Sequence, residues 1–336
     1  MIIEENYKNI PTEKWLSFLD KNKNANVFHN PLMLEVYEKT ALYEPIGVFL
    51  LDSNGDISGL LTGAIQKESK GFWGYFSSRC VILGGPLVKD NDPILVDRLL
   101  KKLNQIVRYK AIYTQFRNLF DIEAFQGVFE QNNYTFEPHL DILIDLNKPF
   151  DVLKGTIHKS RLKNLRKSYN KGSVCKIIED IVEIEKGYEL IRQTYRRIKL
   201  PFPDKDLFDN IVRILVPQNL AKCYALYFED ELIGFRVVLT FKQMIYDYYA
   251  GNHPNHTNKY PNDFLILEVL KDGCEQEYEV FDFGGAGKPN IPYGVRDHKM
   301  QFGGQLVEYG RFLKVHNKPA YQLGKLGISI LKKIKL

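Results

Sequence analysis

The sequence predicts an α/β (α+β) protein of two tandem units, each with a mixed, largely antiparallel sheet flanked by helices. Its length of 336 residues suits about two domains. The order hairpin, strand, helix, strand occurs twice along the chain, which indicates a repeated unit. Neither GxGxxG nor GxxxxGKS/T occurs, so the sequence does not favour a dinucleotide-binding or P-loop fold.

The first unit is expected to span 1–148. Two apolar runs within 44–66 flank the turn-forming stretch Ser53-Asn54-Gly55-Asp56, which predicts an antiparallel hairpin. Apolar residues at helical spacing then predict a helix at 93–108. The unit continues with a strand at 111–117, a helix around 121–132 and a strand at 140–146, and the turn at 147–149 ends it.

The second unit is expected to span 149–336 and to open with a basic helix. Residues 152–171 carry seven Lys or Arg and no acid, with apolar residues at near-helical spacing. A hairpin at 223–241 follows later in the chain. The remaining elements are a strand at 244–251, a helix at 262–276, strands at 279–285 and 305–315, and a C-terminal helix.

Composition excludes several classes of protein. Hydrophobic residues make up 44% and charged residues 26% of the chain, as in ordinary globular proteins. No apolar run reaches the roughly 18 residues that cross a bilayer, and the polar N-terminus has no stretch typical of a signal peptide. The four cysteines lack CxxC spacing, which favours reduced thiols. We therefore expect a cytoplasmic protein, which could work at the inner face of the membrane.

Charge is distributed unevenly along the chain. Residues 1–146 have a net charge of −4, whereas the remainder has +9. A polyanionic partner such as a nucleotide, a tRNA or an anionic lipid head group should therefore meet the second half, and we expect no DNA partner. The tail at 325–336 mixes apolar residues with lysines, so it could contact an anionic membrane, although a helix docked on the sheet is the alternative.

Three stretches carry a resemblance to a known family. They are IHKSRLKNLRKSYNKG, YYAGNHPNHTNKYPNDFLILEVLKDG and VFDFGGAGKPNIPYGVRDHKMQFGGQLVEYGRF. In these stretches the chain resembles the FemAB-like branch of the GNAT acyltransferases. The resemblance implies two tandem GNAT-like units. It also implies the transfer of aminoacyl groups from tRNA to lipid-linked or nucleotide-linked peptidoglycan precursors, or the acylation of amino sugars.

The resemblance therefore predicts an acyl- or aminoacyltransferase that forms an amide on an amine of a cell-envelope precursor by direct attack on an activated carbonyl. No tightly bound cofactor is expected, and the donor would be an aminoacyl-tRNA or an acyl thioester of CoA or of an acyl carrier protein. Two alternatives remain open. One is a non-catalytic GNAT-fold module that binds a nucleotide sugar or tRNA, and the other is a thioester-dependent N-acyltransferase of an amino sugar.

Three residues are candidates for the chemistry. By resemblance, Lys299 would contact the donor or the developing oxyanion, and the alternative is a solvated lysine. Asp282 lies at a strand end before glycines and could orient an amine or a hydroxyl, or simply cap the turn. His253 could accept a proton from the amine, or lie on a surface loop. Because the HxxH pair of His253 and His256 has no evident third ligand, no metal site is expected.

The donor would meet the start of the helix near Tyr260 and Asn262, where free amides and the helix dipole favour anions, although ordinary capping also explains this sequence. Further donor-binding candidates are Gly284 and Gly285 for close backbone approach, Arg296 as a phosphate or carboxylate clamp, and His298 where relatives show an aromatic residue. The candidates for acceptor binding are Lys159, Arg161, Arg166 and Tyr248, with a solvated helix face and a core tyrosine as alternatives.

Overall fold

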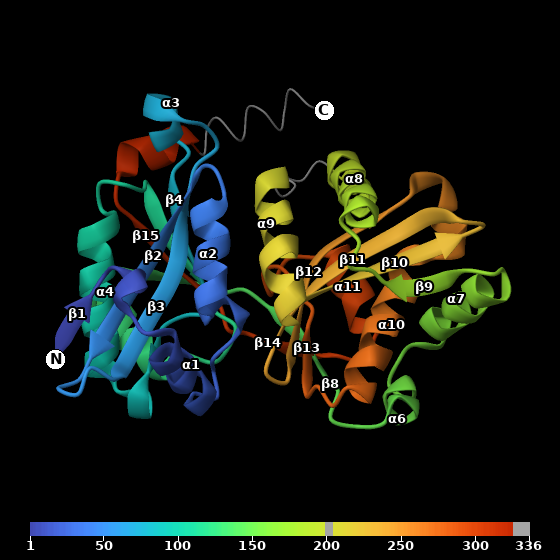
Figure 1. Cartoon of the computed structure of the whole chain (residues 1–336), viewed down its shortest axis with the longest axis horizontal. Helices are drawn as coiled ribbons and strands as arrows, with labels where there is room; N and C mark the ends of the chain where they lie inside the picture. Colours follow the sequence, from blue (N-terminus) through green and yellow to red (C-terminus); the bar gives the residue numbers. More distant parts are fainter. Residues whose placement is uncertain (199–203, 325–336) are drawn as a thin grey trace. The chain divides into compact units, whose positions relative to one another are not determined.

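The computed structural model describes residues 1–198 and 204–324, which fall into two compact units. Unit 1 comprises Met1–Pro138 and the described chain from Tyr309 onward, and unit 2 comprises His139–Glu308. Figure 1 shows the elements of each unit coloured along the sequence. Within the described residues, no helix is long and apolar enough to cross a bilayer.

Unit 1 is a mixed sheet covered by helices. Its central hairpin pairs β2 (Tyr43–Leu51) with β3 (Ile57–Gln66), as the turn sequence predicts. After β4 (Arg79–Leu83), α4 (Pro93–Val107) leads to β6 (Tyr113–Arg117), which lies parallel to β4. The other elements are β1 (Ile2–Glu4), β5 (Leu87–Val88), β7 (Thr135–Glu137), β15 (Arg311–Val315), α1 (Thr12–Lys21), α2 (Pro31–Lys39), α3 (Gly71–Tyr75) and α5 (Gln126–Gln131).

Unit 2 repeats this order. The hairpin of β10 (Ala221–Phe228) and β11 (Glu231–Phe241) is followed by β12 (Met244–Asn252). Helix α10 (Pro261–Glu275) then crosses over to β13 (Val280–Asp282), which lies parallel to β12. The other elements are β8 (Asp141–Asp145), β9 (Val174–Ile177), β14 (Gln305–Val307), α6 (Phe150–Lys154), α7 (Lys159–Asn170), α8 (Ile181–Arg197), α9 (Lys205–Leu215) and α11 (Gly294–Met300).

The sheet of unit 2 is buried on both faces. Alternate residues of β10 divide between two apolar clusters: Tyr224 and Leu226 pack with α10, while Cys223 and Ala225 pack with α8 and α9. Because successive strand residues point to opposite faces, this alternation produces three layers, with helices on either side of the sheet. Figure 1 shows α10 and α8 against these central strands.

The observed boundary between the units differs from the one expected at 148. Strand β8 pairs with β13 and β14 and therefore belongs to unit 2, whereas β15 pairs with β6 and β7 in unit 1. In each unit, the strand that follows the crossover helix therefore pairs with one further antiparallel strand, which is β15 in unit 1 and β8 in unit 2. By sequence order, β15 would belong to unit 2 and β8 to unit 1. A boundary drawn by sequence order misses this exchange because strand partners are set by long-range pairing.

Two elements expected to be continuous are interrupted. The basic segment forms α6 and α7 rather than one helix, because His158 is extended and its side chain accepts a hydrogen bond from the Ser160 N–H, which starts α7. The strand expected at 305–315 is split into β14 and β15 near Gly310, which has φ of 64°. Helices α8 and α9 were not anticipated, and the tail at 325–336 lies outside the described residues.

Candidate functional site

The first turn of α10 is the centre of a polar network in unit 2. Tyr260 precedes the helix with φ of 54° and gives no side-chain cap, and Pro261 follows it. Asp263, in this turn, is only 4% exposed although it carries a carboxylate. A buried carboxylate needs partners, since an unpaired charge away from water is costly.

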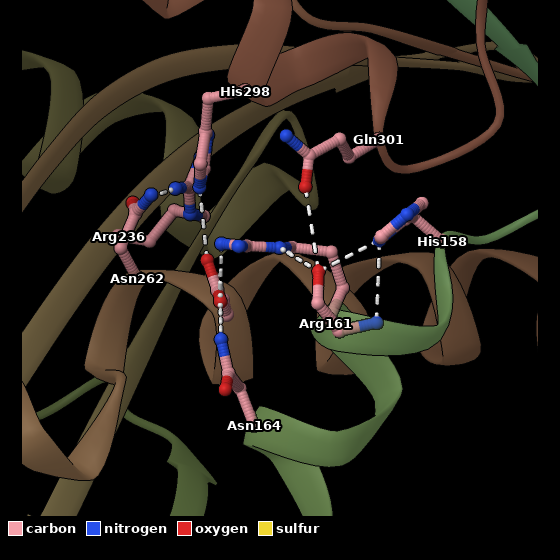
Figure 2. A network of polar contacts seen from close by, with 9 residues as sticks. His158, Arg161, Asn164, Arg236, Asn262, His298 and Gln301 are labelled. Carbon is pink, nitrogen blue, oxygen red and sulfur yellow. Dashed lines mark hydrogen bonds and ion pairs between the residues drawn. The ribbon is translucent and has the colours of Figure 1, made fainter.

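Three side chains from two other elements provide these partners. Arg161 Nη1 and Asn164 Nδ2 of α7 each donate to Asp263 Oδ2 at 2.8 Å, and His298 Nε2 of α11 lies 2.9 Å from Oδ1. Figure 2 shows Arg161, Asn164 and His298 converging on this one point. Burial acts to raise the pKa of Asp263, but the bonds from His298 and Asn164 and the charge of Arg161 outweigh it, so the pKa is lowered. Asp263 is therefore ionised at neutral pH.

A buried arginine joins the same turn to the sheet. Arg236 on β11 is 2% exposed, forms an ion pair with Asp247 and donates from Nη2 to Asn262 Oδ1 at 2.7 Å. Between β11 and β12 the register shifts so that Tyr248 is an extra residue, beside Asp247. A bulge of this kind redirects side chains and is common next to functional sites.

Lys299 lies on α11 directly after His298, and its ammonium group is directed at backbone. Its Nζ donates to the carbonyl oxygens of Phe283, Gly284 and Gly285 at 2.8, 3.3 and 3.2 Å. Burial lowers the pKa of Lys299, against the raising effect of the charges of Asp247, Asp141 and Asp282. The charge of Arg236 also lowers the pKa of Lys299. Because Arg236 is bonded to Asn262, the same arginine acts on Lys299 and on the start of α10.

Asp282 ends β13 and is fully buried. Its Oδ1 accepts the Gly284 N–H at 2.7 Å, across a turn in which Gly284 has φ of +66°. Burial, together with the charge of the neighbouring Asp141 and a hydrogen bond to it, raises the pKa of Asp282 well above its ordinary value. Because like carboxylates at close range do not both ionise readily, the fold favours the protonated form of Asp282.

The pairing of β12 with β13 ends at Tyr246 and Asp282, although β12 continues to Asn252. The backbone that Lys299 contacts begins one residue after this last pair, at Phe283. The predicted residues Asp282, Gly284, Lys299 and Tyr248 all lie at this end of the two strands.

The other candidates for donor and acceptor binding occupy different surroundings. Arg296 donates to the carbonyl oxygens of Lys288 and Ile291, both at 2.8 Å, and so holds its own loop. Lys159 and Arg166 are exposed on α7, and Gly285 is also exposed. Tyr260 is half-buried, with Lys167 Nζ 5.9 Å from its ring centre.

His253 lies in a separate cluster. Its Nε2 is 3.6 Å from Glu231, whose carboxylate also contacts His256 at 2.9 Å. These two histidines occupy the loop between β12 and α10, which contains the short helix η6 (Pro254–Lys259). The side-chain interactions found for His253 are therefore with Glu231 and its own loop.

Asp263, Arg236 and Asp247 are central here, and the sequence interpretation did not single them out. Arg236 was detectable, because a charged residue within the apolar strand sequence LIGFRVVLTF is unusual without a buried partner. Asp263 lies in the stretch at the start of the helix, whose sequence ordinary helix capping was enough to explain. Only the fold reveals that α7 and α11 reach it.

Comparison with known proteins identifies a domain match over part of the chain and solved structures with a similar fold. Residues 158–300 match the family model described as an acetyltransferase (GNAT) domain. FemX has a similar structure, with a TM-score of 0.75, 14% identity and coverage of 96% of this chain and 99% of that chain. No curated protein sequence shows a significant match.

Two further solved structures are similar at a TM-score of 0.58. The C-terminal domain of a putative lysylphosphatidylglycerol synthetase from Agrobacterium fabrum is 13% identical, with 95% and 96% of the two chains covered. A tandem GNAT protein from the clavulanic acid biosynthesis pathway is 10% identical, with 94% and 99% covered. These likenesses confirm the predicted tandem GNAT fold, and the domain match confirms the resemblance to GNAT acyltransferases.

Proposed function

We propose that this chain, whose fold is similar to that of FemX and whose residues 158–300 match a GNAT domain, is an acyl- or aminoacyltransferase that forms an amide on an amine of a cell-envelope precursor. The amine attacks the activated carbonyl carbon directly, the new C–N bond forms, and the bond to the ester or thioester leaving group breaks. The amine proton leaves with the departing oxygen or sulfur. The observation that carries this proposal is the position of Lys299.

Lys299 is suited to stabilise the oxyanion of the tetrahedral intermediate. Its half-buried ammonium is held by the carbonyl oxygens of Phe283, Gly284 and Gly285, so it is positioned before the substrate arrives. A preorganised cation away from bulk water stabilises developing negative charge more strongly than a solvated one. The raised pKa of Asp282 favours its protonated form, which does not cancel this charge. Its proposed role is to hold the turn of Gly284.

The first turn of α10 favours an aminoacyl-tRNA donor over a CoA thioester. Free amides at a helix start commonly bind phosphate. Here the Asp263 carboxylate already lies in that turn, neutralised by Arg161 and bonded to Asn164 and His298. Because the ion pair has no net charge, these side chains offer a pyrophosphate no positive charge at this point. An acyl thioester donor stays the second candidate, because the matching family model is described as an acetyltransferase.

Exposed cations favour an acceptor or donor with a phosphate-bearing carrier. Lys159 and Arg166 project from α7, next to the network that α7 forms with α10. No acidic residue of their own helix can neutralise them, since residues 152–171 contain neither Asp nor Glu. Nucleotide-linked and lipid-linked precursors both supply such phosphates. The name of the Agrobacterium relative, a lysylphosphatidylglycerol synthetase, points to an aminoacylated lipid for that protein and supports an envelope acceptor here.

The test is a matrix of donors and acceptors. Isotope-labelled aminoacyl-tRNAs, acyl-CoAs and acyl carrier proteins are incubated with nucleotide-linked precursors, lipid-linked precursors and free amino sugars. We expect amide-linked label in one combination, lost in Lys299→Met and retained in Lys288→Met, which removes an exposed lysine from the adjacent loop. Binding of tRNA or nucleotide sugar without transfer from any donor would instead identify a non-catalytic binding module.

A further inference from the structure

Glu231, His253 and His256 meet at one end of the unit 2 sheet although Glu231 lies 22 positions before His253. Glu231 begins β11 directly after the turn at Glu229 and Asp230. The loop after β12 is fastened beside it, because the His253 N–H donates to the Ile233 carbonyl at 2.9 Å. His256 follows in the same loop, where its N–H donates to the His253 carbonyl at 3.2 Å.

The three side chains point their polar atoms at a common point. Glu231 Oε2 is 2.9 Å from His256 Nε2, and Glu231 Oε1 is 3.6 Å from His253 Nε2. One potential ligand atom from each of the three residues lies within 4.8 Å of the other two. A tetrahedral zinc ion with bonds of about 2.0–2.1 Å separates neighbouring ligand atoms by about 3.3 Å. Small side-chain rotations therefore convert this cluster into a metal-binding arrangement.

The surroundings also favour a cation. The two imidazoles have only 25% and 19% of their side chains exposed, so they are held in place by packing. The acids Glu229 and Asp230 precede Glu231 in the turn and add negative potential. Phe228 lies 6.0 Å from the His256 ring, centre to centre, and forms an apolar side to the cluster.

One hydrogen bond must change when a metal binds. His253 Nδ1 accepts the Asn255 N–H at 3.3 Å, which places the ring proton on Nε2 in the absence of metal. Coordination through Nε2 moves that proton to Nδ1 and ends this contact. At 3.3 Å the contact is longer than an ordinary N–H hydrogen bond, so its loss opposes binding only weakly.

We propose that Glu231, His253 and His256 form a binding site for a divalent transition metal, with Zn²⁺ as the first ion to test. Two imidazoles and one carboxylate with water in the remaining position suit zinc, and nitrogen ligands disfavour Mg²⁺ and Ca²⁺. A bound ion would tie the β10–β11 turn to the loop that leads into α10. The ion would therefore fasten these two segments to each other, and its binding does not depend on the proposed acyl transfer.

The test measures metal binding by the full-length, untagged chain after removal of metal with a chelator. We expect one equivalent of Zn²⁺, and visible absorption bands of four- or five-coordinate Co²⁺ when Co²⁺ replaces it. Glu231→Gln and His256→Asn should each weaken Zn²⁺ binding by more than about 100-fold, because even changes outside the ligand shell commonly cost about 10–100-fold. His253→Asn should do the same while keeping an N-cap acceptor for Asn255.

Asp230→Asn is the matched control. It removes one negative charge from the same turn, and asparagine tolerates the positive φ of this position, 64°. It should bind Zn²⁺ nearly as tightly as the wild type. Zn²⁺ should also raise the thermal unfolding midpoint of the wild type and of this control, but not of the three ligand variants. Absence of saturable Zn²⁺ binding, or equal binding by all variants, would overturn the proposal. Glu231 would then serve only to contact the two histidines.

Discussion

His298 Nε2 lies 2.9 Å from Oδ1 of Asp263, and this contact joins α11 to the first turn of α10. The residue after His298 is Lys299, whose ammonium group the backbone of 283–285 holds. The position of the proposed catalytic lysine is therefore coupled to the ion pair between Asp263 and Arg161.

Asp263→Asn should destabilise the protein at neutral pH. The substitution leaves Arg161 without its carboxylate, and loss of one partner from a fully buried pair costs about 3–5 kcal/mol. Because Arg161 is 20% exposed, we expect about 2 kcal/mol in urea unfolding at pH 7. Asp297→Asn, which removes an exposed charge from α11, should cost less than about 1 kcal/mol.

The pH dependence of the same variant tests its cause. The pKa of Asp263 is lowered in the folded protein, so its stabilising contribution is present above the unfolded pKa, about 3.9, and is lost as pH falls through the folded pKa. The stability difference between wild type and Asp263→Asn should therefore shrink below pH 4. A difference that is constant down to pH 2 would show that packing, and not charge, causes it.

Asp282→Asn should have the opposite pH dependence. The folded-state pKa of Asp282 is raised, so wild-type stability falls as pH rises from about 3.9 towards that pKa. Asparagine keeps the acceptor for the Gly284 N–H and cannot ionise. Relative to wild type, the variant should be more stable at pH 8 than at pH 4, because only the wild-type side chain gains a charge as pH rises. A relative stability that falls with pH would mean that Asp282 is charged when folded.

The double variant Lys159→Gln/Arg166→Gln should weaken binding of a polyanionic donor without lowering the thermal midpoint. Both side chains are exposed, in contrast to Arg161. In salt titrations of tRNA binding, the plot of the logarithm of the binding constant against the logarithm of the salt concentration should become less steep, by about 1–2 in slope. Lys21→Gln/Lys23→Gln removes two exposed charges from unit 1 and should leave the slope unchanged. Equal slopes for both double variants would remove α7 from the donor-binding surface.

Local sequence patterns predicted most elements of the fold. The hairpins at β2–β3 and β10–β11 follow from turn residues between apolar runs, and α4 and α10 follow from helical spacing. The exchange of β8 and β15 between units was not predictable in this way. Their sequences specify a strand, whereas the choice of partner depends on residues more than a hundred positions away.

Prediction of the site was limited in the same way, because local sequence patterns do not show which distant residues come into contact. Lys299, Asp282 and His298 were singled out from the stretches that carry the resemblance, and their roles stay predictions. The structure joins His298 to the first turn of α10, and the charge of Asp282 acts on Lys299. Arg161 was assigned to acceptor binding, but the fold commits it to Asp263. The interaction between His253 and Glu231 could not be read from spacing, because a strand hairpin brings together residues separated by 22 positions.

The most direct test of the central claim is the single-turnover rate of amide formation by Lys299→Met with saturating donor and acceptor. If Lys299 stabilises the oxyanion, the rate should fall by at least about 100-fold, while donor affinity changes little. Lys288→Met should react at the wild-type rate, since that lysine is exposed in the adjacent loop. A wild-type rate in Lys299→Met, with folding intact by circular dichroism, would contradict the account.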